Sequence, residues 1–336
     1  MEFSFIPSRE IATALQASFR QQLKARYIDM LEQLRDAGVE GISETTLDAL
    51  MAVPASGMNG LFSFVYHRSI ELLEEGRFAE VGKLFDLLVE GRYDTLPKFL
   101  PADRIDAALF SDILSGISKG TTHKEIRLRA VEPRLEDHAA ECIKSGMETL
   151  YKALPDLAFE IDTLVGSVMF FESGGDTTER ATSLTGNTFQ SLILINAVME
   201  PDWIFFLDKF IHEAAHTYLF AMNLQEELVT NTDGPCYQSP LRRDARDMAA
   251  IYHATFVIHR LIYAFDNILK KVEVEESDSK KISGLIKYYQ SRLDSGFDTV
   301  MEHGELSPLG VKLIREGQDY AVSLRPVLAS GDPVLA

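Results

Sequence analysis

The stretch PDWIFFLDKFIHEAAHTYLFAMN, residues 201–223, decides the fold and the chemistry that we expect of this chain. It opens with Pro201, a residue favoured in the first turn of a helix. The apolar run that follows predicts a long helix that is buried inside the protein. His212 and His216 stand four residues apart in it, so their imidazoles lie on one helix face and can reach one metal ion. Glu213 lies about 100° around the helix, close enough to touch a metal-bound water.

The third ligand distinguishes the classes of protein that carry an HExxH pattern. A metzincin needs HExxHxxGxxH, and Leu219 and Met222 stand here where the glycine and the histidine belong. A gluzincin takes a glutamate from a following helix. Glu226 and Glu227 come too soon after the motif, on or just past the helix end, and the next glutamate is Glu273. Neither class of zinc peptidase fits the spacing.

The predicted helix at 242–271 offers His253 instead, among small and apolar residues. We expect His253 to be the third ligand; the alternative is an ordinary core or surface histidine. Arg246 stands seven residues before it, two turns away on the same helix face, and a guanidinium there can hold a carboxylate. Arg242 is a second candidate for this role. Three histidines with an arginine nearby suit Fe(II) as well as Zn.

The arginines also have a simpler interpretation. Arg242, Arg243 and Arg246 can pair with Asp244 and Asp247 on a solvated helix start. The sequence leaves this alternative open.

The rest of the chain predicts a mostly helical α+β fold. Apolar spacing predicts helices at 11–38, 60–75, 77–91, 103–116, 134–154, 242–271, 279–294 and 308–330, and β-rich runs predict buried strands at 161–171 and 189–199. We expect the metal-binding helix to pack beside a small β-sheet, after a helical N-terminal half. Residues 1–130 are predicted to form a helical region that can recognise a peptide, and residues 131–336 the catalytic region.

Composition limits the partners and the compartment. The chain has 33 basic and 51 acidic residues, a net charge of −18, which argues against binding to nucleic acid or an anionic membrane. Cys142 and Cys236 are too few for a disulfide framework or a thiolate zinc site, and no secretory signal or membrane span is apparent. We therefore expect a cytoplasmic protein, and the sequence leaves its oligomeric state open. The loop at 231–240 is expected to be mobile and to form part of the entrance to the site.

Beyond the HEAAH motif, the segment SPLRRDARDMAAIYHATF (239–256) resembles the HExxH-motif family of peptide-modification proteins. Members of this family have a proline and an aromatic residue before an R-x-D-x-R run, and then a histidine followed by small and aromatic residues. Pro240, Arg242, Asp244, Arg246 and His253 stand at the matching positions, with Leu241 in place of the aromatic. The upstream TSLTGNTFQSLILIN, with Gly186, resembles the strand entry of the family. The resemblance covers roughly residues 160–260.

The resemblance implies an Fe(II)- and 2-oxoglutarate-dependent dioxygenase that β-hydroxylates a side chain of a ribosomally made precursor peptide. His212, His216 and His253 would hold the iron, and Arg246 or Arg242 would bind the distal carboxylate of the cosubstrate. Glu213 would then orient a ligand or a water. The alternative is a zinc-dependent peptidase in which Glu213 is the general base. A third reading is a binding protein with a structural metal, for which a fourth protein ligand is missing.

Overall fold

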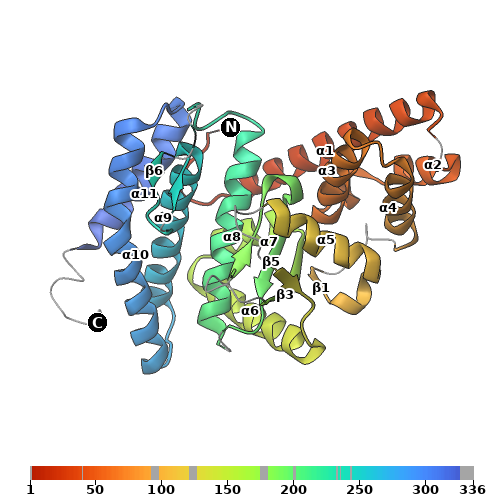
Figure 1. The fold of residues 1–336 in the computed structure, drawn as a ribbon. Coiled ribbons are helices and arrows are strands. Elements are labelled where there is room, and N and C mark those ends of the chain that lie inside the picture. Colours follow the sequence, from red (N-terminus) through yellow and green to blue (C-terminus); the bar gives the residue numbers. More distant parts are fainter. Residues whose placement is uncertain are drawn as a thin grey trace. The chain divides into compact units, whose positions relative to one another are not determined.

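The structure is a computed structural model, and it describes residues 2–39, 41–91, 98–120, 127–174, 181–199, 202–231, 234, 236–242 and 244–325. Most of these residues are helical, and a small mixed β-sheet accompanies the helices (Figure 1). The predicted α+β class with a predominance of helix is confirmed at this level.

Two compact units share the chain, and each is built from separate segments. Unit 1 comprises Met1–Thr13, Ile143–Thr163 and Trp203–Ala336, and unit 2 comprises Ala14–Cys142 and Leu164–Asp202. The units therefore do not divide near residue 130, where we expected a boundary. The reason is that the sheet of unit 2 takes strands from both sides of that position, between Phe99 and Asn196. The roles expected of residues 1–130 and 131–336 stay predictions.

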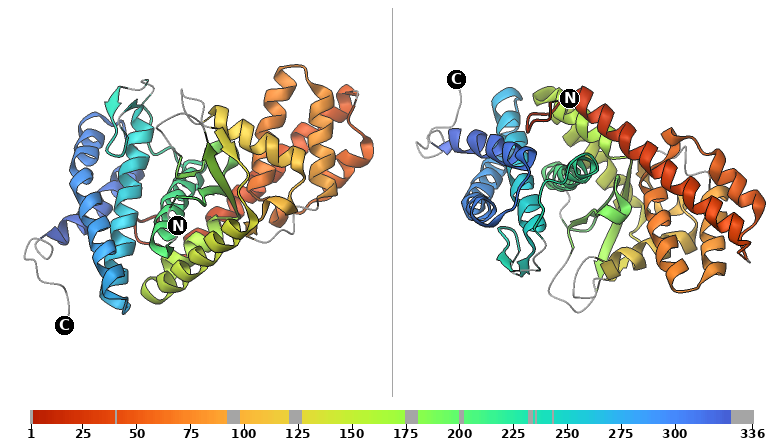
Figure 2. Two further views of the ribbon diagram at one scale, coloured as in Figure 1. Left: turned by 60° about the horizontal axis from the view of Figure 1, so that its bottom comes forward. Right: turned by 90° about the horizontal axis from the view of Figure 1, so that it is seen from above.

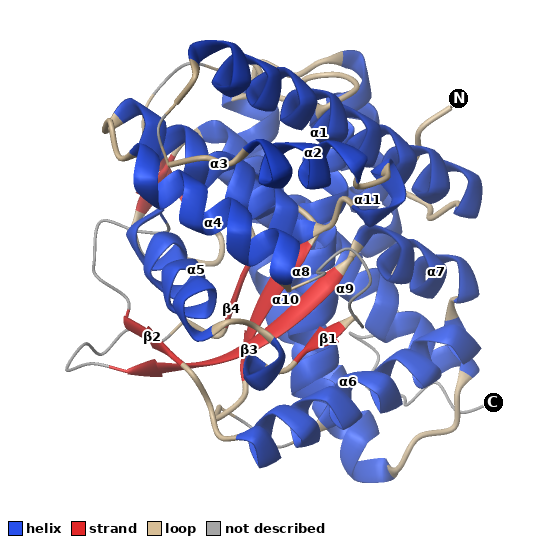
Figure 3. Cartoon of the chain, turned by 90° about the vertical axis from the view of Figure 1, so that its right-hand side faces the viewer, coloured by secondary structure: helices blue, strands red, loops and turns tan. Residues whose placement is uncertain are grey.

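Unit 2 combines helices with the sheet (Figure 3). Its helices are most of α1 (Arg9–Ala37), α2 (Glu44–Ala52), α3 (Gly60–Glu74), α4 (Phe78–Glu90), α5 (Ala107–Gly120) and the first half of α6 (Pro133–Ala153). Its strands are β1 (Phe99–Leu100), β2 (Arg127–Arg129), β3 (Ser167–Gly174), β4 (Ser183–Leu184) and β5 (Leu192–Asn196), in the order β1-β3-β5-β4 with β2 paired to the end of β3. The β1-β3-β5 pairs are parallel, and every residue of β5 is buried, as expected of a parallel strand that is covered on both faces.

One strand prediction was wrong in its first part. Residues 161–164 belong to α7 (Pro155–Leu164), and the strand starts only at Ser167. Pro155 is the first residue of this helix, where its missing N–H costs nothing. Leu157, Ala158 and Ile161 recur at helical spacing and are buried, so the packing of α7 overrides the β propensity of Ile161.

Unit 1 is built on four long helices: α8 (Trp203–Asn223), α9 (Met248–Lys271), α10 (Glu276–His303) and α11 (Pro308–Ser323). Helix α9 is central, because it contacts α8, α10 and α11, and Figure 2 shows α9, α10 and α11 side by side. By length and composition α9 is the one helix in the described residues that could cross a membrane, but most of it is buried inside the protein, as in the core helix of a soluble protein. Helix α8 agrees closely with the helix predicted from residues 201–223.

The start of α9 differs from the prediction. Asp247 caps the helix by accepting a hydrogen bond of 2.8 Å from the backbone N–H of Ala250, and the first helical residue is Met248. Arg246 lies before the cap, in strand β7 (Ala245–Arg246), which pairs with β6 (Tyr237–Gln238). The prediction that Arg246 lies two turns along the same helix face as His253 is therefore wrong.

Candidate metal centre

Three of the predicted ligands come together in unit 1. His212 and His216 lie one turn apart on α8, with ring centroids 5.1 Å apart. His253, on α9, lies against His216 with ring centroids 5.4 Å apart and ring planes inclined by only 21°. His212, His216 and His253 are each mostly covered by the protein, with part of each residue exposed. The spacing of the HEAAH motif and the packing of α8 on α9 thus bring together histidines that are 37 residues apart in sequence.

One nitrogen atom of His216 and one of His253 are close enough together to bind the same metal ion. His216 Nδ1 and His253 Nδ1 are 3.1 Å apart and share a hydrogen bond, with the donor depending on the tautomer. Two nitrogen ligands of one ion, each with a bond of ~2.0–2.2 Å and roughly a right angle between them, are separated by about the same distance. Phe220, one turn after His216, packs against His253 with ring centroids 5.1 Å apart and forms an apolar wall beside the pair.

The charge state of the three rings suits metal binding, since only a neutral imidazole has a free lone pair. Burial lowers the pKa of His212 to about 3, and the charges of Lys209 and Arg242 lower it as well. Burial lowers the pKa of His253 to about 4, although Asp247 opposes the shift. The pKa of His216 lies well below its usual range, chiefly because of burial and then because of its two histidine neighbours.

The three imidazoles of His212, His216 and His253 are therefore suitable metal ligands, since they are neutral and lie close together. It is not yet a coordination sphere, because in the described part of the chain no three His, Cys, Asp or Glu side chains have their ligand atoms arranged around one point. Nδ1 of His216 and Nδ1 of His253 are instead hydrogen-bonded to each other. Rotation of the rings would free these atoms, and three imidazoles would leave other positions of the ion open for small ligands.

Glu213 lies between the two histidines in sequence and is 4% exposed, so it is more deeply buried than the rings. Its backbone carbonyl accepts a hydrogen bond of 3.0 Å from the Thr217 hydroxyl. Its position on α8, about 100° around the helix from His212, is the one that the motif predicts. Whether it orients a ligand or acts as a general base stays a prediction.

The two candidate arginines are in different environments. Arg246 is ion-paired with Asp244, with Nη2 and Oδ2 2.7 Å apart, as in the simpler interpretation of this segment. Arg242 is exposed, and in the described residues its guanidinium has no ion pair or hydrogen bond. Its positive charge contributes to the lowered pKa of both His212 and His216. Arg242 is thus the better placed of the two to bind an anion beside the histidines.

The remaining predicted features lie around this group. Glu226 and Glu227 are exposed beyond the end of α8, so they do not compete with His253 as a third ligand. The 231–240 loop is held at its start, where Asn231 hydrogen-bonds the backbone of His303 and Glu305 at 3.0 and 2.6 Å. Residues 232, 233 and 235 lie outside the described part of the chain, as does Arg243. The mobility of the loop and its place at the entrance stay predictions.

His259, six residues after His253, belongs to the core and contacts α11. Its Nε2 lies 3.1 Å from Oε1 of Gln318, and a Cβ on Gly317 would meet its Nδ1 at 2.6 Å, so only glycine fits there. Burial lowers the pKa of His259 to about 4.

This burial predicts a loss of stability in acid. The folded protein keeps His259 neutral while the unfolded chain takes up a proton near pH 6.5, so the free energy of unfolding falls as the pH drops from about 6.5 to about 4. One histidine contributes at most about 1.4 kcal/mol per pH unit in this range. Urea unfolding of EDTA-treated protein at a series of pH values measures the slope. His259→Asn should have a shallower slope than the wild type, and an equal slope would contradict the assignment.

Several residues of the site were not predicted from the sequence. Lys209 and Phe220 lie within one turn of the motif and could have been found from helical spacing. Arg260 lies seven residues after His253, two turns along the same face of α9, and it forms an ion pair with Glu160 inside the protein. No sequence motif predicts this ion pair, because its two residues come from helices about a hundred residues apart in the chain.

Comparison with known proteins does not identify the chain: no protein-family model matches it, and no curated protein is significantly similar to it in sequence. The resemblance to the HExxH-motif peptide-modification family therefore depends on the motif residues alone.

Proposed function

We propose that this protein is an Fe(II)- and 2-oxoglutarate-dependent oxygenase, and that it β-hydroxylates a side chain of a ribosomally made precursor peptide. The observation that carries the proposal is the meeting of His212, His216 and His253 from two helices. The bound iron, with 2-oxoglutarate and dioxygen, would supply the oxidation of a C–H bond.

The residues of the chain would bind and orient these groups. The three neutral imidazoles would hold the iron and leave open positions for the cosubstrate and dioxygen. Phe220 would keep water from one side of the imidazoles, since it packs against His216 and His253. Glu213 would orient a ligand or a water from its buried position next to His212. In this proposal α8 is the metal-binding helix of the fold.

Arg242 is the residue that we assign to the distal carboxylate of 2-oxoglutarate. A guanidinium fork matches a carboxylate with two parallel hydrogen bonds. Arg246 is the other candidate from the sequence, but its guanidinium is already engaged by Asp244. The positive charge of Arg242 also raises the local affinity for an anion in a chain whose net charge is −18.

Arg242→Ala is expected to weaken 2-oxoglutarate binding roughly 10- to 100-fold, the effect of losing a charge-assisted hydrogen-bonded pair. Isothermal titration of anaerobic, Fe(II)-loaded protein with 2-oxoglutarate measures the change. Arg246→Ala is the matched control, because it removes an arginine four residues away that is already paired. If Arg246→Ala has the larger effect, the assignment of the carboxylate to Arg242 is wrong.

The proposed reaction is tested by succinate formation. Protein purified without oxygen is supplied with Fe(II), 2-oxoglutarate and then oxygen, and succinate is measured with and without a random-sequence peptide library. We expect succinate only when all three are present, faster with peptide, together with peptides that have gained one oxygen atom. Cleaved peptides from a zinc-loaded sample that needs no 2-oxoglutarate would show instead that the protein is a peptidase with Glu213 as its base.

A further inference from the structure

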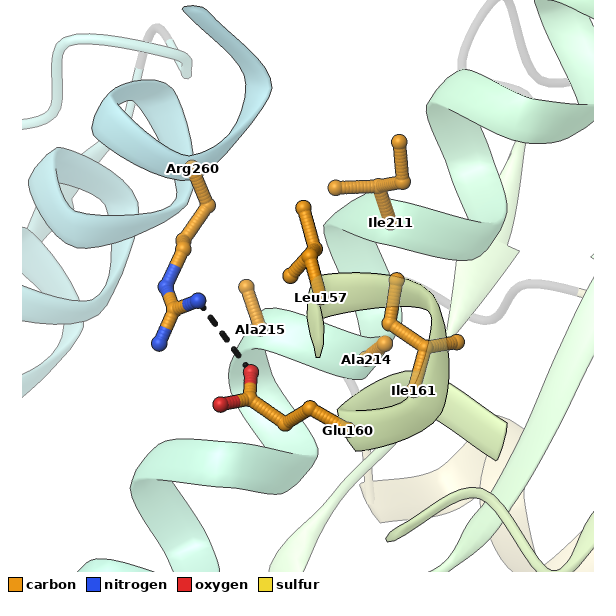
Figure 4. A pocket seen from close by; sticks show the side chains of 7 residues that line it. All are labelled: Leu157, Glu160, Ile161, Ile211, Ala214, Ala215 and Arg260. Atoms are coloured by element: carbon orange, nitrogen blue, oxygen red, sulfur yellow. Dashed lines mark ion pairs between the residues drawn. The ribbon is translucent and has the colours of Figure 1, made fainter. Parts of the chain in front are cut away.

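A small cavity lies inside unit 1, between α7, α8 and α9 (Figure 4). Its apolar wall includes Ile211, Ala214 and Ala215 of α8, which lie next to His212 and His216 along the chain. Its charged wall is formed by Glu160 of α7 and Arg260 of α9, whose side chains point toward each other. The space has room for about one water molecule.

The two charged side chains are almost completely buried and only loosely joined. Arg260 Nη1 and Glu160 Oε1 are 3.2 Å apart, and the side chains are 1% and 5% exposed. Aromatic rings cover the faces of the guanidinium, with Tyr218 at 4.8 Å and Phe5 and Phe256 at 5.1 and 5.2 Å from its central carbon. These contacts stabilise the charge but leave the N–H groups along its edge without acceptors.

Several polar atoms at this place lack a hydrogen-bond partner. Among the described residues, none of the three nitrogens of Arg260 has one in acceptable geometry, and neither does Oε2 of Glu160. Buried polar groups are costly when they are left unpaired, and in native proteins such groups are commonly joined by an internal water. A water can accept from the guanidinium edge and donate to the carboxylate, which is the combination missing here.

We propose that the cavity is a binding site for one ordered water molecule, which joins Glu160 of α7 to Arg260 of α9, and that this hydrated pair fixes α9 beside the part of α8 that carries His212 and His216. Ile211 and Ala215 of the apolar wall are the sequence neighbours of His212 and His216, and Arg260 lies two turns after His253 on the same face of α9. The pair therefore fixes α9, the helix of His253, at a cavity whose apolar wall is the part of α8 next to His216. Glu160 and Arg260 are positioning residues, and neither touches the proposed metal.

High-resolution diffraction from the wild-type protein tests the water site directly. We expect one water peak within ~2.7–3.2 Å of Glu160 Oε2 and of an Arg260 nitrogen. A dry cavity, a bound ion in it, or a two-bond pair between Glu160 and Arg260 that closes the space would overturn the proposal. This result does not depend on whether the protein binds iron.

The positioning role is tested with Glu160→Gln, which keeps the shape and the water contacts, and Glu160→Leu, which removes both. We expect the crystal structure of Glu160→Gln to retain the 3.1 Å contact between the Nδ1 atoms of His216 and His253, and that of Glu160→Leu to lose it. Asp266→Asn is the control, since it disturbs a different carboxylate, on the helix of Arg260, that has two polar partners, Lys270 and Tyr320. An intact contact in Glu160→Leu, or its loss in the control, would overturn the positioning role.

Should Glu160→Leu not fold, Glu160→Ala in the same cavity replaces it, and the side-chain nitrogen resonances of His216 in solution replace the crystal structure. A shift in these resonances for Glu160→Ala but not for Glu160→Gln is expected. Equal spectra for the two variants would contradict the proposal.

Discussion

His212→Ala and His216→Ala are each expected to abolish stoichiometric binding of Fe(II) while leaving the fold intact. Replacing groups that only orient a ligand costs roughly 10- to 100-fold in metal affinity, so losing one of three ligands should cost more than about 100-fold. The rings are partly accessible, and their truncation should lower the free energy of unfolding by only about 1–2 kcal/mol. His253→Ala should behave in the same way if α9 supplies the third ligand.

Metal content per chain, with circular dichroism as the measure of folding, checks this expectation. Co(II) can replace Fe(II) as a spectroscopic probe that survives in air. His259→Asn is the matched control, because it also removes a histidine of α9, six residues from His253, that contacts α11 instead of His216. Full metal content in either α8 variant would show that the HEAAH motif does not bind metal here.

Breaking the buried ion pair is expected to have the largest effect on stability, and the two partners should not be equivalent. Removing one member of a buried pair typically costs about 3–5 kcal/mol, because it leaves an uncompensated charge in the interior. Glu160→Leu leaves a guanidinium that cannot lose its proton, so the full cost is expected at every pH between 5 and 8.

Arg260→Met leaves a buried carboxylate that can become neutral. Burial already raises the pKa of Glu160 although Arg260 opposes the shift, and without the arginine the pKa should rise further. A carboxyl group with a raised folded-state pKa takes up its proton in the folded protein first, so the variant should regain stability as the pH falls through that pKa. Urea unfolding of both variants between pH 5 and 8 measures this difference. Parallel pH profiles would contradict it.

The long elements of the fold could be predicted from the sequence because their patterns are local. Helix α8 follows from a buried apolar run after a proline, and β5 from the continuous apolar letters LILIN. Helix α7 was missed because its buried Ile161 favours a strand, and only packing contacts override that preference. The cap at Asp247 is a local signal, an aspartate three residues before the N–H that it accepts from, and it explains why α9 starts after Arg246.

In the candidate site, too, some features follow from local sequence and others depend on the packing of helices. The pairing of His212 with His216 is a property of one helix and needs no tertiary structure to predict. The approach of His253 to His216 depends on how α8 packs against α9, and the sequence suggested it by the absence of other ligands and by the resemblance of residues 239–256 to the family motif. The Glu160–Arg260 pair and the cavity beside it arise from packing between three helices, which no local pattern encodes.

The most direct test of the account is anomalous diffraction at the iron edge from crystals of the protein loaded with Fe(II) under anaerobic conditions. The account predicts one iron peak per chain, roughly 2.0–2.2 Å from one nitrogen of each of His212, His216 and His253. An iron peak at other residues, or none at all in protein that retains the contact between α8 and α9, would contradict it.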